Sequence, residues 1–130
     1  MHIDLERKLL IKYPAIFGVD LCVSGTELKW DIACGDGWYG LLDTLCRDIQ
    51  IYVDLAGVPQ VKLVQIKEKF GGLSVGYTAP DTNVDSLISK ATADSKLLCE
   101  NCGCFGTLKR TRHGWIKSLC IECLCQLNSE

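Results

Sequence analysis

The chain has 130 residues, of which 48% are hydrophobic and 23% are charged, and its formal net charge is −2. A chain of this length and apolar content can bury a core of its own, which excludes wholesale disorder. Its apolar runs are too short to cross a bilayer and its first residues do not resemble a secretory signal peptide. We therefore expect a cytoplasmic protein that does not bind membranes.

The charge is unevenly distributed along the chain. Residues 1–98 hold ten Lys and Arg against thirteen Asp and Glu, whereas residues 99–130 hold four against three. These four cations are Lys109, Arg110, Arg112 and Lys117. They form a local basic cluster that could meet an anion, but it is much weaker than the basic surface of a dedicated DNA-binding protein.

The N-terminal segment is predicted to be helical. Leu5, Leu9 and Tyr13 recur at helical spacing after Asp4, which we expect to be the N-cap, and Pro14 should end the helix. A short strand is predicted around residues 27–33.

A second helix is predicted from Asp36, as its cap, to the residues before Gly57. Its apolar stripe consists of Leu42, Leu45, Cys46, Ile49 and Val53.

A β-hairpin is predicted next, with strands 61–70 and 73–78 joined by a two-residue turn at Gly71-Gly72. This turn places Phe70 opposite Leu73 and directs six side chains to the core, namely Val64, Ile66, Phe70, Leu73, Val75 and Tyr77. On the other face, Lys67 and Lys69 lie across from the small residues Gly76 and Ser74. That face is either an ordinary solvated surface or a platform for a ligand.

A third helix is predicted after a turn at 81–83, with Val84, Leu87, Ile88, Ala91 and Leu98 on its apolar face. The fold class that these elements indicate is α+β, with helices packed on a small antiparallel sheet. We expect an α+β domain at 1–98 and a zinc-ribbon appendage at 99–130 that packs on it as a single compact unit.

The chain ends in two C-x2-C pairs, Cys99/Cys102 and Cys120/Cys123, separated by seventeen residues. This spacing is typical of a structural four-cysteine zinc site, in which each pair supplies two thiolates to a tetrahedral ion. Cys104 and Cys125 each offer an alternative ligand. Cys22, Cys34 and Cys46 are predicted to be buried as small hydrophobic residues in a reducing environment.

Trp38 and Tyr39 follow Cys34-Gly-Asp-Gly at the start of the second helix. The free N–H groups of a helix start attract anions, and these two rings could stack on a nucleobase. For Trp38 taken alone, the favoured interpretation is that it anchors the helix to the core. The alternation of Lys109, Arg110, Arg112 and Trp115 is compatible with nucleic-acid contact. No nucleophilic triad, phosphate loop or HExxH motif is present, so we expect that the protein is not an enzyme.

Three motifs resemble a family of small phage and prophage proteins. They are Cys34-Gly-Asp-Gly-Trp38, Lys67-Glu-Lys-Phe-Gly-Gly-Leu73, and the terminal Cys99-x-x-Cys-Gly with Gly114-Trp115 and Leu119-Cys120. The family pattern has Arg where this chain has Ser74. The resemblance implies a phage origin and a location in the cytoplasm of an infected bacterium, and it implies no activity.

The leading hypothesis is a non-enzymatic binding protein that captures a small anionic ligand, a nucleotide-derived signal of host immunity, as some small phage proteins do. Its binding residues are predicted to be Trp38, Tyr39, Lys67, Lys69, Arg110 and Arg112, and a homo-oligomer is expected because pockets often form where surfaces meet. The alternative is that the zinc ribbon itself binds a host protein or a nucleic acid.

Overall fold

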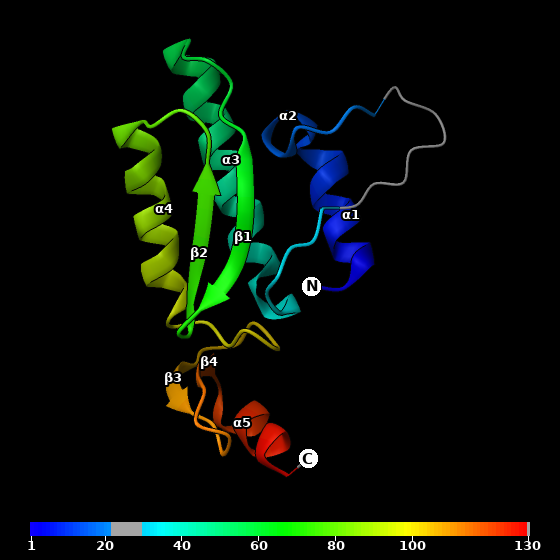
Figure 1. The fold of residues 1–130 in the computed structure, drawn as a ribbon, viewed down its shortest axis with the longest axis vertical. Helices are drawn as coiled ribbons and strands as arrows, with labels where there is room; N and C mark the ends of the chain where they lie inside the picture. Colours follow the sequence, from blue (N-terminus) through cyan, green and yellow to red (C-terminus); the bar gives the residue numbers. More distant parts are fainter. Residues whose placement is uncertain (22–29, 130) are drawn as a thin grey trace.

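The computed structural model describes residues 1–21 and 30–129, in which helices accompany two small antiparallel sheets of two strands each. Figure 1 shows the longer sheet in front of α3, with α4 to its left, α1 and α2 to its right, and a smaller C-terminal part at the turn end of that sheet. The elements are α1 (Ile3–Lys12), α2 (Pro14–Phe17), a 3-10 helix (Asp36–Trp38), α3 (Tyr39–Ala56), β1 (Leu63–Lys69), β2 (Gly72–Tyr77), α4 (Thr82–Ser95), β3 (Thr107–Arg110), β4 (Ile116–Leu119) and α5 (Ile121–Asn128). The predicted α+β fold class is therefore confirmed.

Two predicted helix caps are different in the structure. α1 is capped by His2, whose Nδ1 accepts a hydrogen bond from the Asp4 amide at 3.1 Å, and not by Asp4. Asp36 does not cap the second helix. No side-chain hydrogen bond caps the start of that helix, and Asp36 Oδ1 instead accepts a hydrogen bond from the His2 amide at 2.7 Å. That helix begins instead with a 3-10 turn at Asp36–Trp38 and continues as α3. Pro14 ends α1 as predicted and also opens α2.

The predicted apolar stripe of α3 is confirmed, because all five of its residues are buried in the main core. The third helix is also confirmed as α4, and Asp81 is its N-cap with hydrogen bonds from the amides of Asn83 and Val84. Leu98 lies beyond the end of this helix. Of the strand predicted around 27–33, residues 27–29 lie outside the described residues, and Ala33 forms only a parallel bridge to Lys67.

The hairpin forms, but its predicted register is wrong. Phe70 and Gly71, both with positive φ, occupy the two turn positions, so that Lys69 pairs with Gly72 and Lys67 pairs with Ser74. Positive φ at both central residues is the geometry of a type I′ turn, which suits the twist of a hairpin. As a consequence, Phe70 projects from the turn and is exposed, and not in the core.

A second irregularity changes which residues of β1 face the core. The pairing with β2 shifts between Leu63 and Gln65, so Leu63 and Ile66 are both buried while Val64 is exposed. A bulge of this kind places an extra residue in one strand and reverses the alternation beyond it. The predicted core position of Val64 is therefore wrong.

Within residues 1–21 and 30–129, buried apolar side chains form two separate clusters. The large one draws its members from residues 9–91, and the small one contains Cys99, Leu119 and Cys123. Cys34 and Cys46 are buried in the large cluster as predicted, and burial raises the pKa of each thiol to about 12. Cys22 lies outside the described residues. Among those described, no helix combines the length and the apolar character that a bilayer-spanning segment requires.

Candidate metal centre and adjacent groove

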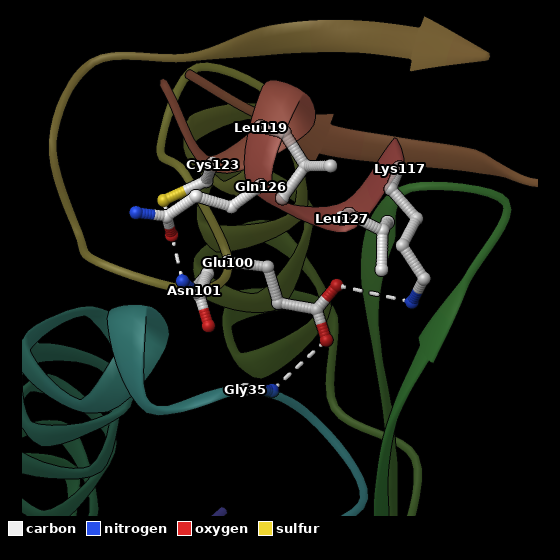
Figure 2. Close-up of a pocket in the computed structure, with 8 residues that line it drawn as sticks. All are labelled: Gly35, Glu100, Asn101, Lys117, Leu119, Cys123, Gln126 and Leu127. Carbon is white, nitrogen blue, oxygen red and sulfur yellow. Dashed lines mark hydrogen bonds and ion pairs between the residues drawn. The ribbon is translucent and has the colours of Figure 1, made fainter. Parts of the chain in front are cut away.

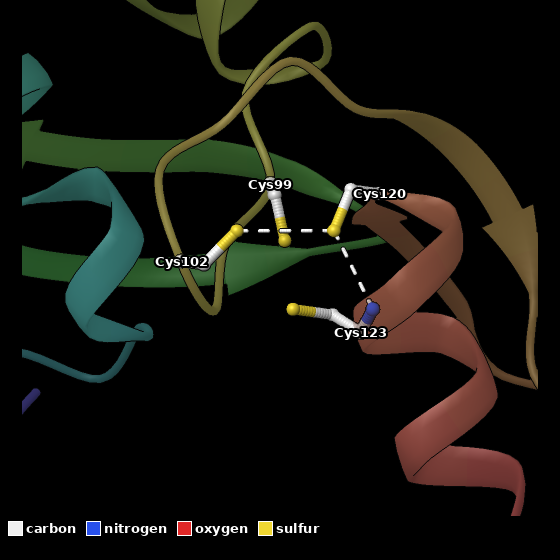
Figure 3. A group of neighbouring side chains, drawn as sticks. All are labelled: Cys99, Cys102, Cys120 and Cys123. Carbon is white, nitrogen blue, oxygen red and sulfur yellow. Dashed lines mark hydrogen bonds between the residues drawn. The ribbon is translucent and has the colours of Figure 1, made fainter.

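The four cysteines of the two C-x2-C pairs come together at one point (Figure 3). Cys99 and Cys102 lie on the loop after α4, Cys120 is the N-cap of α5, and Cys123 lies in its first turn. The second pair therefore opens a helix, and the β3–β4 hairpin connects the two pairs. We call residues 99–129, which contain these elements, the cysteine module.

The distances between the sulfur atoms fit a single bound ion. All four Sγ atoms lie within 4.8 Å of one another, and the Sγ atoms of Cys102 and Cys120 are 3.8 Å apart. A disulfide would need about 2.05 Å, whereas a tetrahedral ion with sulfur at about 2.3 Å separates its ligands by about 3.8 Å. The four residues are thus positioned to hold a metal ion. Cys104 and Cys125 are both exposed and are not members of this cluster.

Groups around the sulfur atoms support the same arrangement. Burial raises the pKa of Cys99, but hydrogen bonds from the amides of Cys120, Cys102 and Asn101 outweigh it and lower the pKa to about 6. The Asn101 side-chain amide donates to Cys123 Sγ at 3.2 Å. That bond lowers the pKa of Cys123, but burial and the neighbouring sulfur atoms raise it to about 12. Four thiolates cannot share this site without a cation, and such outer hydrogen bonds orient metal ligands.

The cysteine module is attached to the main core through Glu100, the residue after the first ligand. The amide of Gly35 donates to Glu100 Oε2 at 2.9 Å, and the amide of Gly37 donates to the Glu100 carbonyl oxygen at 2.7 Å. Trp38 Nε1 donates to the carbonyl oxygen of Leu98, the residue immediately before the module, at 3.0 Å. The Cys34-Gly-Asp-Gly-Trp38 motif is therefore the segment of the core on which the first knuckle lies.

A second attachment involves Lys117 on β4. Its ammonium group lies 3.0 Å from Glu68 Oε1 on β1 and 3.6 Å from Glu100 Oε1. The next residue, Ser118, donates through Oγ to the Gly71 carbonyl oxygen at 2.6 Å. Figure 2 shows the Glu100 carboxylate between Gly35 and Lys117, at a small cavity of about 240 Å³ that α5 also lines. The Lys67–Leu73 motif thus contacts the module through Glu68 and Gly71.

An open groove lies where the turn of the β1–β2 hairpin faces the β3–β4 hairpin. It has a volume of about 710 Å³. Its lining residues are Glu68, Lys69, Phe70, Arg110, Gly114, Trp115, Ile116 and Lys117. We call it the hairpin groove. Two of the predicted binding cations, Lys69 and Arg110, meet here, and both aromatic side chains are exposed, Phe70 by 74% and Trp115 by 59%.

The β3–β4 turn sets the position of Trp115. Thr111 is buried, its amide donates to the Trp115 carbonyl oxygen at 2.7 Å, and its Oγ1 accepts from the Trp115 amide at 3.2 Å. Arg110 donates from Nη1 to the Gly114 carbonyl oxygen at 3.1 Å. The indole ring therefore extends from a turn whose backbone is closed by hydrogen bonds on both sides.

The other predicted binding residues are not in this groove. Trp38 is completely buried, so its ring has no face for a ligand and the predicted stacking role is wrong for this residue. Tyr39 packs partly buried against the main core. Lys67 is half-buried on β1 beside the Ala33 bridge, and Arg112 is exposed in the β3–β4 turn, where its amide donates to Asn128 Oδ1 at 2.9 Å.

Sequence reasoning missed Phe70, Glu68 and Glu100. The alternation of residues around Phe70 predicts a core position, and Gly71-Gly72 is the pair that the sequence favours for the turn, because phenylalanine rarely adopts the positive φ that a type I′ turn requires. No sequence pattern predicts the roles of Glu68 and Glu100, because their ion-pair partner Lys117 is distant along the chain.

Comparisons with known proteins return no relatives. No protein-family model matches this chain, no curated protein sequence matches it, and no solved structure matches its fold.

Proposed function

We propose that this protein is a zinc-structured, non-enzymatic binding protein that captures a nucleotide-type ligand in the hairpin groove. The observation that carries the proposal is the presence of two cations, Lys69 and Arg110, beside two exposed aromatic side chains, Phe70 and Trp115, around one groove.

Zinc is the proposed metal because four thiolates in a tetrahedral set are the ligands of a closed, structural zinc site. The ion would be held by Cys99, Cys102, Cys120 and Cys123. Its role in the proposal is to hold the first knuckle and the start of α5 together.

A nucleotide matches the chemistry of the groove. Exposed aromatic faces stack on nucleobases, and arginine and lysine pair with phosphate through charge-assisted hydrogen bonds. Large aromatic side chains exposed to water on adjacent turns are costly for a surface without a partner. The base would lie on Phe70 or Trp115 and the phosphate near Lys69 and Arg110.

Capture without turnover is proposed because the carboxylate and one ammonium group of the groove neutralise each other. Glu68 and Lys117 form an ion pair at 3.0 Å, so neither is placed to act on a ligand as a free acid or base. In a phage-infected bacterium this activity would sequester a nucleotide signal of host defence in the cytoplasm. A second copy covering the open groove would enclose the ligand, which is why an oligomer is expected.

The first test is ligand-induced stabilisation of the zinc-loaded protein by a panel of mono-, di- and cyclic nucleotides. A ligand at a hundred times its Kd should stabilise the protein by about 2.7 kcal/mol and raise its Tm. Lys69→Ala with Arg110→Ala should remove this shift. The matched control is Arg47→Ala with Lys62→Ala, which deletes the same two residue types at exposed positions outside the groove and should retain it.

Aromatic stacking is tested in the same assay with Phe70→Ala. Loss of one stacked ring should weaken binding by about 1–3 kcal/mol. Phe105→Ala removes a phenyl ring of similar exposure, 71% against 74%, at a position outside the groove and should have little effect. Failure of every nucleotide to stabilise the protein, or full binding by a folded Lys69→Ala/Arg110→Ala variant, would overturn the proposal, and a cleaved ligand recovered afterwards would make the protein an enzyme.

The alternative function is capture of single-stranded nucleic acid by the same groove. The observation that favours it is the openness of the groove, because stacking platforms on open basic surfaces are typical of single-strand binding. An oligonucleotide that binds more tightly than any mononucleotide, with affinity that falls steeply as salt rises, would select this alternative.

A further inference from the structure

We infer that Lys117 is a positioning residue that holds the two sides of the hairpin groove together, so that ligand capture depends on docking of the cysteine module. This inference rests on the proposed function for the ligand, but its docking step can be measured without one.

The groove is shared between the two parts of the molecule. Lys69 and Phe70 belong to the β1–β2 hairpin, whereas Arg110 and Trp115 belong to the module. Each hairpin contributes one cation and one aromatic ring, so the relative position of the two hairpins determines whether all four side chains can contact one ligand.

Lys117 bridges these parts through an ion pair to each of them. It lies between Glu68 on the core hairpin and Glu100 on the knuckle, and all three side chains are largely removed from solvent. Glu100 Oε1 is buried and accepts no hydrogen bond in the described part of the chain, so Lys117 is the group that balances its charge there. Burial by itself lowers the pKa of Lys117. The two carboxylates outweigh this effect and raise the pKa, so the ammonium group stays charged.

Removing the ammonium group would leave two carboxylates facing each other across the junction. An uncompensated buried charge is strongly destabilising, and separation of the module from the hairpin is the movement that hydrates both acids. The bonds that would open with it are those of Ser118 to Gly71 and of Gly35 and Gly37 to Glu100.

The chain offers a close control in Lys109, which is the cross-strand partner of Lys117 in the β3–β4 hairpin. Its ammonium group donates to Thr107 Oγ1 at 2.6 Å, within the same strand. Lys109→Met therefore removes the same charge from the same hairpin without removing a contact between the module and the core.

Docking is measured by hydrogen exchange of the Gly35 and Gly37 amides in the zinc-loaded protein without ligand. Lys117→Met should accelerate exchange at both amides roughly tenfold or more and weaken nucleotide binding by a similar factor. Lys109→Met should leave the exchange unchanged. Lys117→Arg keeps the cation and should preserve docking, and Co²⁺ charge-transfer absorption confirms that each variant still assembles the four-cysteine site.

A neutral version of the cluster separates charge balance from direct ligand contact. The triple variant Glu68→Gln, Glu100→Gln, Lys117→Met removes the acids together with the cation, and it should recover both the protection of the glycine amides and most of the binding. Retained protection in Lys117→Met, or binding that stays lost in a docked triple variant, would overturn the inference, the latter because it would make Lys117 a direct ligand contact. If the native protein binds no nucleotide while Lys117→Met still loses protection, the proposed function fails and the positioning role of Lys117 stands.

Discussion

At the scale of single residues, glycine determines how closely the module can approach the core. A Cβ on Gly37 would overlap the Cys99 carbonyl oxygen and would lie 2.5 Å from the Gly103 amide nitrogen. Both neighbours are backbone atoms of the first knuckle, which cannot move without displacing a cysteine of the four-cysteine cluster. Gly40, three residues later in α3, has open space around its Cβ position. The two glycines therefore have different roles although they are almost adjacent in the sequence.

This difference predicts opposite effects of the same substitution. Gly37→Ala should destabilise the protein by roughly 2–3 kcal/mol, because an added methyl group in a close-packed site forces the backbone apart. Gly40→Ala should stabilise it by up to about 1 kcal/mol, because alanine favours a helix and restricts the unfolded chain. Urea denaturation of both variants with zinc present measures the free energy of unfolding, and equal effects from the two would contradict this reading of Gly37.

At the scale of elements, the start of α5 determines which of its cysteines join the four-cysteine cluster. Cys120 precedes the helix as its N-cap and accepts from the Cys123 amide at 3.4 Å, so the two thiols of this pair lie on one side of the first turn. Cys125, two residues after Cys123, is on a different face of the helix because successive residues rotate by about 100°. Cys104 contributes its carbonyl oxygen to the knuckle, where it accepts from the Cys99 amide at 2.7 Å, while its thiol is exposed.

Serine substitutions should distinguish the cysteines that bind zinc from those that do not. Cys102→Ser should lower zinc affinity by roughly a hundredfold or more, because a metal ligand is lost from a closed site. Cys104→Ser and Cys125→Ser should leave the affinity and the one-to-one stoichiometry unchanged. Competition with a chromophoric chelator measures all three, and a loss of affinity in Cys104→Ser would show that the metal uses a different set of four cysteines.

At the scale of the whole molecule, the two apolar clusters differ greatly in size. The main core is built from residues of α1, α2, α3, β1, β2 and α4, whereas the buried members of the second cluster are Cys99, Leu119 and Cys123. Two of these three are proposed metal ligands. A cluster this small cannot offset the conformational entropy of ordering about thirty residues, so the proposed metal ion would have to supply most of the folding free energy of the module.

Chelation should therefore unfold the module and leave the core folded. With zinc removed, amide protection should be lost across residues 107–128 and largely retained in α3 and in β1–β2. Protection at Gly35 and Gly37 should fall as well, because both amides donate to Glu100. Hydrogen exchange with and without chelator tests this, and cooperative unfolding of the entire chain would show instead that core and module form one folding unit.

The elements whose physics is local could be predicted from the sequence. The apolar stripe of α3 and the convergence of Cys99, Cys102, Cys120 and Cys123 both follow from residue spacing within short segments of chain. The local pattern could not predict the register of the hairpin, because strand alternation permits two registers. In the register that forms, Gly71 lies against Leu108, and a Cβ on Gly71 would lie only 2.5 Å from a Leu108 methyl carbon.

Which chemistry-bearing residues meet was decided by tertiary structure alone. Trp38 is buried in the main core and Tyr39 packs partly buried against it. Phe70 and Trp115 line the same groove although 45 positions separate them in the sequence. The link between Glu68, Glu100 and Lys117 has the same origin, since charges pair across space when burial removes water from around them. The spacing of residues predicts the four-cysteine site because its members come in local pairs. It does not predict the groove, because each side of the groove comes from a different hairpin.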